Sequence, residues 1–191
     1  IGGNTKIRLI VLSDKKVYVI LKKGFDKKYL EKELYVKKNF KYMPTPKIYG
    51  YGNNGLRYSE EYISGLSPDR ITKKEESQNV LLDALGHIHR MLNETKKEIP
   101  LNEYVKSLEK EISKNIVMIP HFDSKTKNNY MDLLKNLIGA TKLFSDTFIH
   151  VAYCHGDFQP GNIVYDGKKT WILDWEHSRT RHIGYDLFVL L

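Results

Sequence analysis

Near the end of this 191-residue chain, three oxygen-bearing side chains follow one another at a spacing that suits phosphate chemistry. Asp157 and Asn162 lie in the segment HGDFQPGN, and Asp174 closes the later segment TWILD. Carboxylate and carboxamide oxygens are hard ligands that favour Mg²⁺, and no pair of Cys or His residues stands at a zinc spacing. Mg²⁺ with few protein ligands usually holds the phosphates of a nucleotide. The three residues therefore indicate a site for a magnesium-bound nucleotide.

A predicted hairpin explains how these separated residues meet. The segments NIVY and TWILD read as short strands, and the turn residues Asp166-Gly167-Lys168-Lys169 connect them. Antiparallel pairing brings Asn162, before the first strand, close to Asp174, at the end of the second. Asp157 lies on the loop that leads into the same end. We therefore expect the three side chains to converge without the help of a helix.

The rest of the chain reads as a strand-rich part followed by a helical part. Residues 6–12 and 17–22 have the composition of paired strands, and two further short strands surround the turn Asn53-Asn54-Gly55. Between these pairs, residues 27–40 have helical spacing, with Glu33 inside the apolar arc. From about residue 75 onward helical periodicity dominates. The pattern predicts an α+β protein with a small antiparallel-sheet lobe over residues 1–63 and a helical lobe over residues 64–191.

The segments HGDFQPGNIVYDGKKTWILDWE and IGYDL resemble the catalytic core of the aminoglycoside phosphotransferase and choline kinase group. These are small-molecule kinases with a protein-kinase-like, two-lobed fold. The protein-kinase catalytic loop has the order His-x-Asp-x₄-Asn, followed by a metal-binding Asp. His155, Asp157, Asn162 and Asp174 match that order.

The resemblance implies a role for each of the four residues. Asp157 would orient the hydroxyl of the acceptor, and Asn162 and Asp174 would hold Mg²⁺. A carboxylate with an ordinary pKa is adequate for this role, because the nucleophile loses its proton late in a loose transition state. His155 is interpreted as a support for the loop backbone and not as a base.

The resemblance also implies a phosphate-binding lysine on a strand and a helical glutamate that holds it. The segment VILK places Lys22 at the end of a strand, and Glu33 is its predicted partner. A buried carboxylate without a partner is costly, which supports a cation close to Glu33. Lys23 with Glu31 is the alternative pair if the strand register differs.

Further residues are assigned to the nucleotide by the same resemblance. Gly3 and Asn4 lie where a loop over the phosphates is expected. Glu61 and Ile63 resemble the hinge whose backbone pairs with adenine, and the alternative is a plain buried strand end. Gln159, which stands where protein kinases have a lysine, completes the predicted nucleotide site.

The departures from the protein-kinase pattern favour a small acceptor. Asp186 resembles the aspartate that anchors the catalytic loop, and it follows Asp174 by only 12 residues, which leaves no room for an activation segment. The resemblance therefore implies an ATP- or GTP-dependent phosphotransferase that uses Mg²⁺. Its acceptor would be a hydroxyl of an aminoglycoside, of choline or ethanolamine, or of a sugar or related metabolite. Glu176 and residues 102–144 are candidates for the acceptor side.

Two other functions are open for this sequence. One is a catalytically weak, pseudokinase-like regulatory protein that binds a nucleotide with the same fold. The other is a nucleic-acid binder, since residues 1–62 hold 14 Lys and Arg against 6 Asp and Glu, whereas residues 63–191 hold 17 of each. Interleaved exposed aromatic residues and a known nucleic-acid motif are lacking, so the sequence predicts no nucleic-acid partner.

Composition also bears on location and completeness. The sequence has neither a long apolar run nor a basic and apolar leader, which predicts a cytoplasmic protein without a membrane span. Its only cysteine, Cys154, reads as a small buried hydrophobe and suits a reducing compartment. The chain begins at the presumed phosphate loop and stops within a helix at FVLL, which predicts a kinase shortened at both ends.

Overall fold

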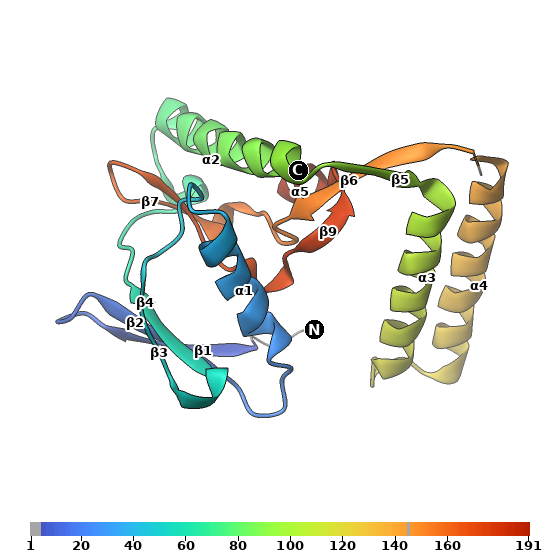
Figure 1. The fold of residues 1–191 in the computed structure, drawn as a ribbon, viewed down its shortest axis with the longest axis horizontal. Helices are drawn as coiled ribbons and strands as arrows, with labels where there is room; N and C mark the ends of the chain where they lie inside the picture. Colours follow the sequence, from blue (N-terminus) through green and yellow to red (C-terminus); the bar gives the residue numbers. More distant parts are fainter. Residues whose placement is uncertain (1–4, 145) are drawn as a thin grey trace. The chain divides into compact units, whose positions relative to one another are not determined.

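The computed structural model describes residues 5–144 and 146–191 (Figure 1). Contacts divide the chain into two compact units, one made of Ile1–Lys96 with Ala152–Leu191 and the other of Lys97–Val151. The predicted lobe boundary at residue 63 lies inside the first unit. The described residues assigned from the sequence to catalysis and nucleotide binding all belong to this first unit, whereas the candidate acceptor residues 102–144 lie in the second.

An antiparallel four-stranded sheet opens the first unit. Its strand order is β1-β2-β4-β3, and every neighbouring pair is antiparallel. In β2, Val17 and Val19 are buried whereas Tyr18 between them is exposed, because side chains alternate between the two faces of a strand. The bounds are β1 Lys6–Val11, β2 Lys16–Leu21, β3 Ile48–Tyr51 and β4 Arg57–Glu61.

Helix α1 (Lys28–Asn39) belongs to both hydrophobic clusters of the unit. Leu30 packs in the sheet cluster with Val17, Val19 and Tyr58, whereas Val36 belongs to the larger cluster of the helical part. Glu33 lies on the same buried face, as the sequence predicted. The helix therefore holds its single inward carboxylate at the junction between the sheet and the helical part.

The larger cluster joins α2 to the predicted hairpin. Helix α2 (Lys74–Thr95) contributes Val80, Ala84, Ile88 and Met91 at helical spacing. Strands β7 (Ile163–Tyr165) and β8 (Thr170–Ile172) pair antiparallel, which confirms the hairpin. The unit ends with β9 (Arg179–His182), which neighbours β6, and with α5 (Tyr185–Leu190).

The second unit is a helical hairpin. Strand β5 (Lys97–Pro100) pairs with the start of β6 (Phe148–Cys154), and α3 (Leu101–Met118) lies beside α4 (Ser124–Thr141), as Figure 1 shows. The Asp123 carboxylate caps α4 by accepting a hydrogen bond from the Thr126 N–H at 2.7 Å. In the part of the chain that the structure describes, no helix combines the length and apolarity that a membrane span requires.

Candidate active site

The open end of the β7–β8 hairpin brings Asn162 and Asp174 together. Ile163 pairs with Ile172 in the ladder, and the Leu173 N–H donates to the Asn162 carbonyl at 2.8 Å. Asp174 follows Leu173 directly and has a left-handed backbone (φ 63°, ψ 59°). Non-glycine residues rarely adopt this conformation, and strained residues of this kind gather at functional sites. The hairpin therefore brings the backbones at Asn162 and Asp174 together as expected, and a shared site for their side chains stays a prediction.

Asn162 also fixes the Asp157 carboxylate. Its side-chain amide donates to Asp157 Oδ2 at 3.0 Å and to the Asp157 carbonyl at 2.8 Å. The Gln159 amide donates to the same Oδ2 at 3.1 Å. Because the nitrogen of the Asn162 amide faces Asp157, its oxygen is left for another ligand. Asp157, Gln159 and Asn162 thus form one polar group on the loop.

His155 supports this loop from beneath. The ring is fully buried, its Nε2 lies 2.8 Å from the Leu173 carbonyl, and its Nδ1 accepts from the Asp157 N–H at 3.2 Å. A carbonyl can only accept, so Nε2 carries the proton and the ring is neutral. Burial lowers the pKa of His155, against the opposing effect of the Asp186 carboxylate. The histidine therefore ties the loop to the residue before Asp174, and its predicted supporting role is confirmed.

The neutral state of His155 predicts a pH dependence of stability. In the unfolded chain histidine takes up a proton as the pH falls through about 6.5, whereas the buried ring stays neutral to lower pH. We therefore expect the melting temperature to fall between pH 7.5 and 5.5. His155→Gln should reduce this fall, and His121→Gln, at an exposed histidine, should leave it unchanged. An equally steep fall in His155→Gln would contradict the assignment.

Asp186 anchors the loop from α5. Its Oδ2 accepts from the His155 N–H at 2.7 Å, and its Oδ1 accepts from the Gly156 N–H at 2.8 Å. Gly156 has a φ of +86°, and a Cβ at this position would lie 2.2 Å from the His177 carbonyl oxygen. Only glycine fits there, which explains a His-Gly-Asp loop. The anchoring role that the sequence predicted for Asp186 is confirmed.

Removing this anchor should destabilise the protein. Asp186→Ala leaves two backbone N–H donors without their acceptors, and each orphaned buried donor costs about 1–3 kcal/mol. Asp186→Asn keeps one acceptor oxygen and should lose less. Denaturant unfolding measures both, with Asp83→Ala on the exposed face of α2 as the control. Equal stabilities for Asp186→Ala and the control would contradict the role.

The lysine that reaches Glu33 is Lys6 of β1, which corrects the predicted pair of Lys22 with Glu33. Lys6 Nζ lies 2.6 Å from Glu33 Oε2 and 2.8 Å from Asp174 Oδ1, and its side chain is only 4% exposed. Lys22 follows the last residue of β2, and its backbone N–H pairs with the Thr5 carbonyl. The odd-numbered residues of β2 face α1, so a side chain at position 22 has the wrong parity to reach Glu33.

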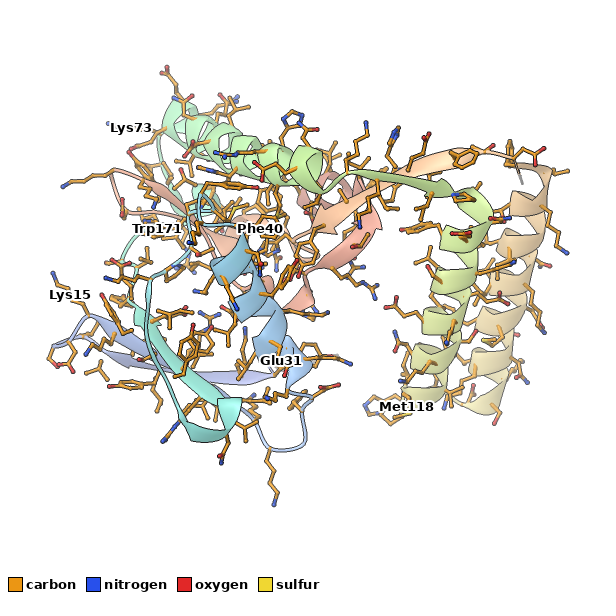
Figure 2. All side chains as sticks on the ribbon, viewed as in Figure 1. Lys15, Glu31, Phe40, Lys73, Met118 and Trp171 are labelled. Carbon is orange, nitrogen blue, oxygen red and sulfur yellow. The ribbon has the colours of Figure 1, made fainter. Side chains whose placement is uncertain are left out.

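The alternative pair of Lys23 with Glu31 does not form either. Glu31, labelled in Figure 2, is exposed on α1 and pairs with Lys27 one turn away at 3.3 Å. It therefore belongs to the surface of the helix and not to the site.

Lys6, Arg8, Glu33, Asp174 and Glu176 together form what we call the Lys6 cluster. Arg8 Nη2 lies 3.5 Å from Glu33 and 3.6 Å from Asp174. Burial alone would lower the pKa of Lys6, but the nearby Glu33 and Asp174 carboxylates raise it above its ordinary value. Burial alone would raise the pKa of Glu33, but Lys6 and Arg8 lower it to about 2. Lys6 and Glu33 are therefore both charged at neutral pH.

Glu176 is a member of this cluster, and its predicted place on the acceptor side stays a prediction. Its carboxylate is 7% exposed, accepts a hydrogen bond from the Thr5 hydroxyl and lies 3.3 Å from Lys6 Nζ. Burial tends to raise the pKa of Glu176, but hydrogen bonds from His177 and Thr5 lower it to about 2. The Glu176 carboxylate therefore interacts with Thr5 and Lys6 inside the protein.

A cavity of about 160 Å³ lies beside the cluster and includes both predicted hinge residues. Glu61 and Ile63 form one side, and Leu173, which precedes Asp174, lies on another. Mixed apolar walls with a few polar groups are typical of small-molecule sites. The remaining lining residues are Arg8, Ile10, Val17, Pro46, Glu60 and Tyr62. The predicted loop residues Gly3 and Asn4 lie outside the described residues.

Sequence reasoning missed Lys6 and Arg8, although the chain carries a signal for them. In the segment KIRLIV the charged residues stand two apart, so they share one face of the strand, and Ile7 and Leu9 share the other. Ile7 and Leu9 are exposed, whereas Lys6 is buried. If the apolar face of a strand is assumed to point inward, Lys6 and Arg8 are placed on the outer face, which is the reverse of what the structure shows.

The fold is that of small-molecule kinases related to protein kinases. The choline/ethanolamine kinase family protein of Mesorhizobium loti has a TM-score of 0.65 at 17% identity, with 100% of this chain and 61% of that chain covered. Choline kinase LicA of Streptococcus pneumoniae gives 0.63 at 17% identity, with 100% and 66% covered. The gentamicin complex of APH(2″)-IIa gives 0.68 at 12% identity, with 99% and 67% covered.

The family model described as choline/ethanolamine kinase matches residues 17–191, and the chain belongs to this family. The predicted resemblance and fold class are thereby confirmed. The chain spans about three fifths of the length of the Mesorhizobium loti protein. No curated protein sequence matches it.

Proposed function

We propose that the protein is a phosphotransferase that moves the γ-phosphoryl group of ATP or GTP to a hydroxyl of a small molecule. The observation that carries this proposal is one continuous chain of contacts. The Asn162 side chain donates to the Asp157 carboxylate, and the Asn162 carbonyl accepts from the N–H of Leu173, the residue before Asp174. Lys6 forms ion pairs with both Asp174 and Glu33. These groups lie on the hairpin, the sheet and α1, and two residues in contact with them, Arg8 and Leu173, line one cavity.

Asp157 is the proposed orienting group for the acceptor. Its carboxylate has no cationic partner among the described residues and accepts only from the amides of Gln159 and Asn162. It is therefore free to accept a hydrogen bond from an acceptor hydroxyl. In a loose transition state the acceptor oxygen bonds to phosphorus as the bond to the β-phosphate oxygen breaks, and the hydroxyl proton leaves late toward Asp157.

Asn162 and Asp174 fit a magnesium ion by the chemistry of their donors. The Asn162 amide turns its nitrogen to Asp157, which leaves the oxygen, and Asp174 uses Oδ1 for Lys6. One amide oxygen and one carboxylate oxygen, with phosphate oxygens, suit the octahedral preference of Mg²⁺. Bound there, the ion would neutralise charge on the phosphates. The protein's own part is to fix these two oxygens through the hairpin and the neutral His155.

The cavity is the proposed place for the purine. Val17, Ile10 and Leu173 offer apolar faces, and the backbone from Glu61 to Ile63 runs along its edge. Flat purine rings pack well between such aliphatic groups, and a strand edge can pair with their polar rim.

We also propose a cytoplasmic location, because the Cys154 thiol is free and fully buried, with a pKa that burial raises to about 12.

The acceptor class is tested with a panel. The purified chain is incubated with Mg²⁺ and ATP or GTP, and with choline, ethanolamine, streptomycin, gentamicin or a hexose. Nucleoside diphosphate release and the mass of the acceptor product are measured. Acceptor-dependent release with a mass gain of one phosphoryl group is expected for one member. Nucleotide binding without transfer would favour a regulatory protein. The absence of both nucleotide binding and phosphoryl transfer would overturn the proposal.

A further inference from the structure

Resting on the proposed function, we propose that Lys6 of β1 binds the α- and β-phosphates of the nucleotide. In this protein the phosphate-binding lysine would therefore lie on β1 and not on β2, where the resemblance placed it. The lysine is defined by its partners: it must be held by the inward glutamate of α1 and lie next to the metal-binding aspartate. Lys6 alone meets both conditions among the described lysines, at 2.6 Å from Glu33 and 2.8 Å from Asp174.

The register of the sheet explains how the exchange works. Lys6 pairs directly with Leu21 across β1 and β2, so the two Cα atoms are immediate neighbours. Leu21 has the inward parity of Val17 and Val19 and packs against their cluster. The inward position at the end of β2 is therefore occupied by an aliphatic side chain. A lysine on the adjacent strand, at the same level, delivers its ammonium group to the same place.

Arg8 gives a second observation on the same face of β1. Its Nη1 lies 3.2 Å from Glu60, but its buried Nη2 donates no hydrogen bond to any described residue. This nitrogen lies at 3.5 to 3.6 Å from Glu33 and Asp174, and Arg8 lines the purine cavity. A buried donor without a hydrogen bond is costly unless a ligand supplies the acceptor. Arg8 and Lys6 thus mark a cationic path from the cavity to Asp174 that suits a polyphosphate.

The geometry also argues against a purely structural ion pair. Lys6 faces three carboxylates, from Glu33, Asp174 and Glu176, so the cluster has one more acidic than basic side chain even when Arg8 is included, and a bound cation would balance it. Asp174 remains 28% exposed, so the cluster opens at that residue. The opening is where a phosphate with its metal would meet the lysine.

Lys6→Met tests the assignment by comparing ligands with and without phosphates. We expect the dissociation constant of Mg-ATP and Mg-ADP to rise about 10- to 100-fold, the range for losing one hydrogen bond to a charged group. The dissociation constant of adenosine should stay within about twofold, because the cavity itself is unchanged. The same substitution at Lys38, which is exposed on α1, is the control.

A variant with the lysine moved to the paired position distinguishes a loss of phosphate binding from a loss of folding stability. The double variant Lys6→Met with Leu21→Lys returns an ammonium group to the paired position. It should recover at least about tenfold of the lost Mg-ADP affinity. Lys22→Met tests the lysine that the sequence favoured, and a greater loss of phosphate-dependent affinity there than in Lys6→Met would overturn the inference.

The outcomes distinguish this inference from the proposed function. Wild-type protein that binds neither ATP nor GTP would overturn both. Wild-type protein that binds nucleotide while Lys6→Met binds Mg-ADP equally well would overturn this inference alone. If Lys6→Met does not fold, the relocated variant decides. Recovery of folding and Mg-ADP affinity there supports the inference, and a folded variant without Mg-ADP affinity overturns it.

Discussion

Asp157→Ala should lower turnover by about 10²–10⁴-fold, the usual contribution of a positioned acid or base group. The affinity for Mg-ATP should change little. The Asp157 carboxylate accepts only from two side-chain amides, and Asn162 keeps its second hydrogen bond, to the Asp157 backbone carbonyl, in the variant. Single-turnover and steady-state kinetics with the acceptor found in the panel measure the effect.

Two companion variants sharpen this experiment. Asp157→Asn keeps the shape of the side chain but removes its charge, and it should lose nearly as much turnover as the alanine variant. Asp83→Ala, on the exposed face of α2, is the control. Wild-type turnover in Asp157→Ala would remove Asp157 from the mechanism, whereas a loss of Mg-ATP affinity equal to the loss of turnover would assign it to nucleotide binding.

Asp174→Asn should abolish the dependence of nucleotide binding on Mg²⁺. It should also lower turnover by at least about 10²–10³-fold, the scale of losing one electrostatic stabiliser of the transition state. Asparagine is the right substitution because Asp174 has a positive φ, which asparagine tolerates better than alanine does. A loss of function then reports the missing charge and not backbone strain. Thermal shifts with ADP, in Mg²⁺ or in a chelator, give the measurement.

Asp166→Asn provides a control on the same hairpin. Asp166 lies at the opposite, exposed end and accepts from Lys168, Lys169 and Trp171. Its substitution should leave the magnesium-dependent shift unchanged. If Asp174→Asn also retained the full shift, the metal would have to be held elsewhere, and the proposed roles of Asn162 and Asp174 would both fail.

Local sequence was sufficient for the hairpin, the loop and their anchor. A two-strand pattern around a turn determines which residues meet at its open end, because pairing and parity follow from the chain itself. Asn162 and Asp174 were found in this way. Asp186 was found through the resemblance of GYDL to the family's anchoring aspartate. Glu33 was found by its position inside the apolar arc of a helix, since a buried carboxylate is costly without a cation.

Only the tertiary structure decided which cation pairs with the buried Glu33 carboxylate. The choice between Lys6 and Lys22 depends on where β2 ends and how β1 pairs with it, and a shift of one residue turns a side chain to the other face. Lys6 and Asp174 are 168 positions apart, so their contact follows from the packing of β1 against the hairpin and not from any local pattern. The same holds for Glu176, whose buried partners lie at the start of the chain. Sequence by itself determined the hairpin residues and the need for a cation, while long-range packing decided which lysine meets it.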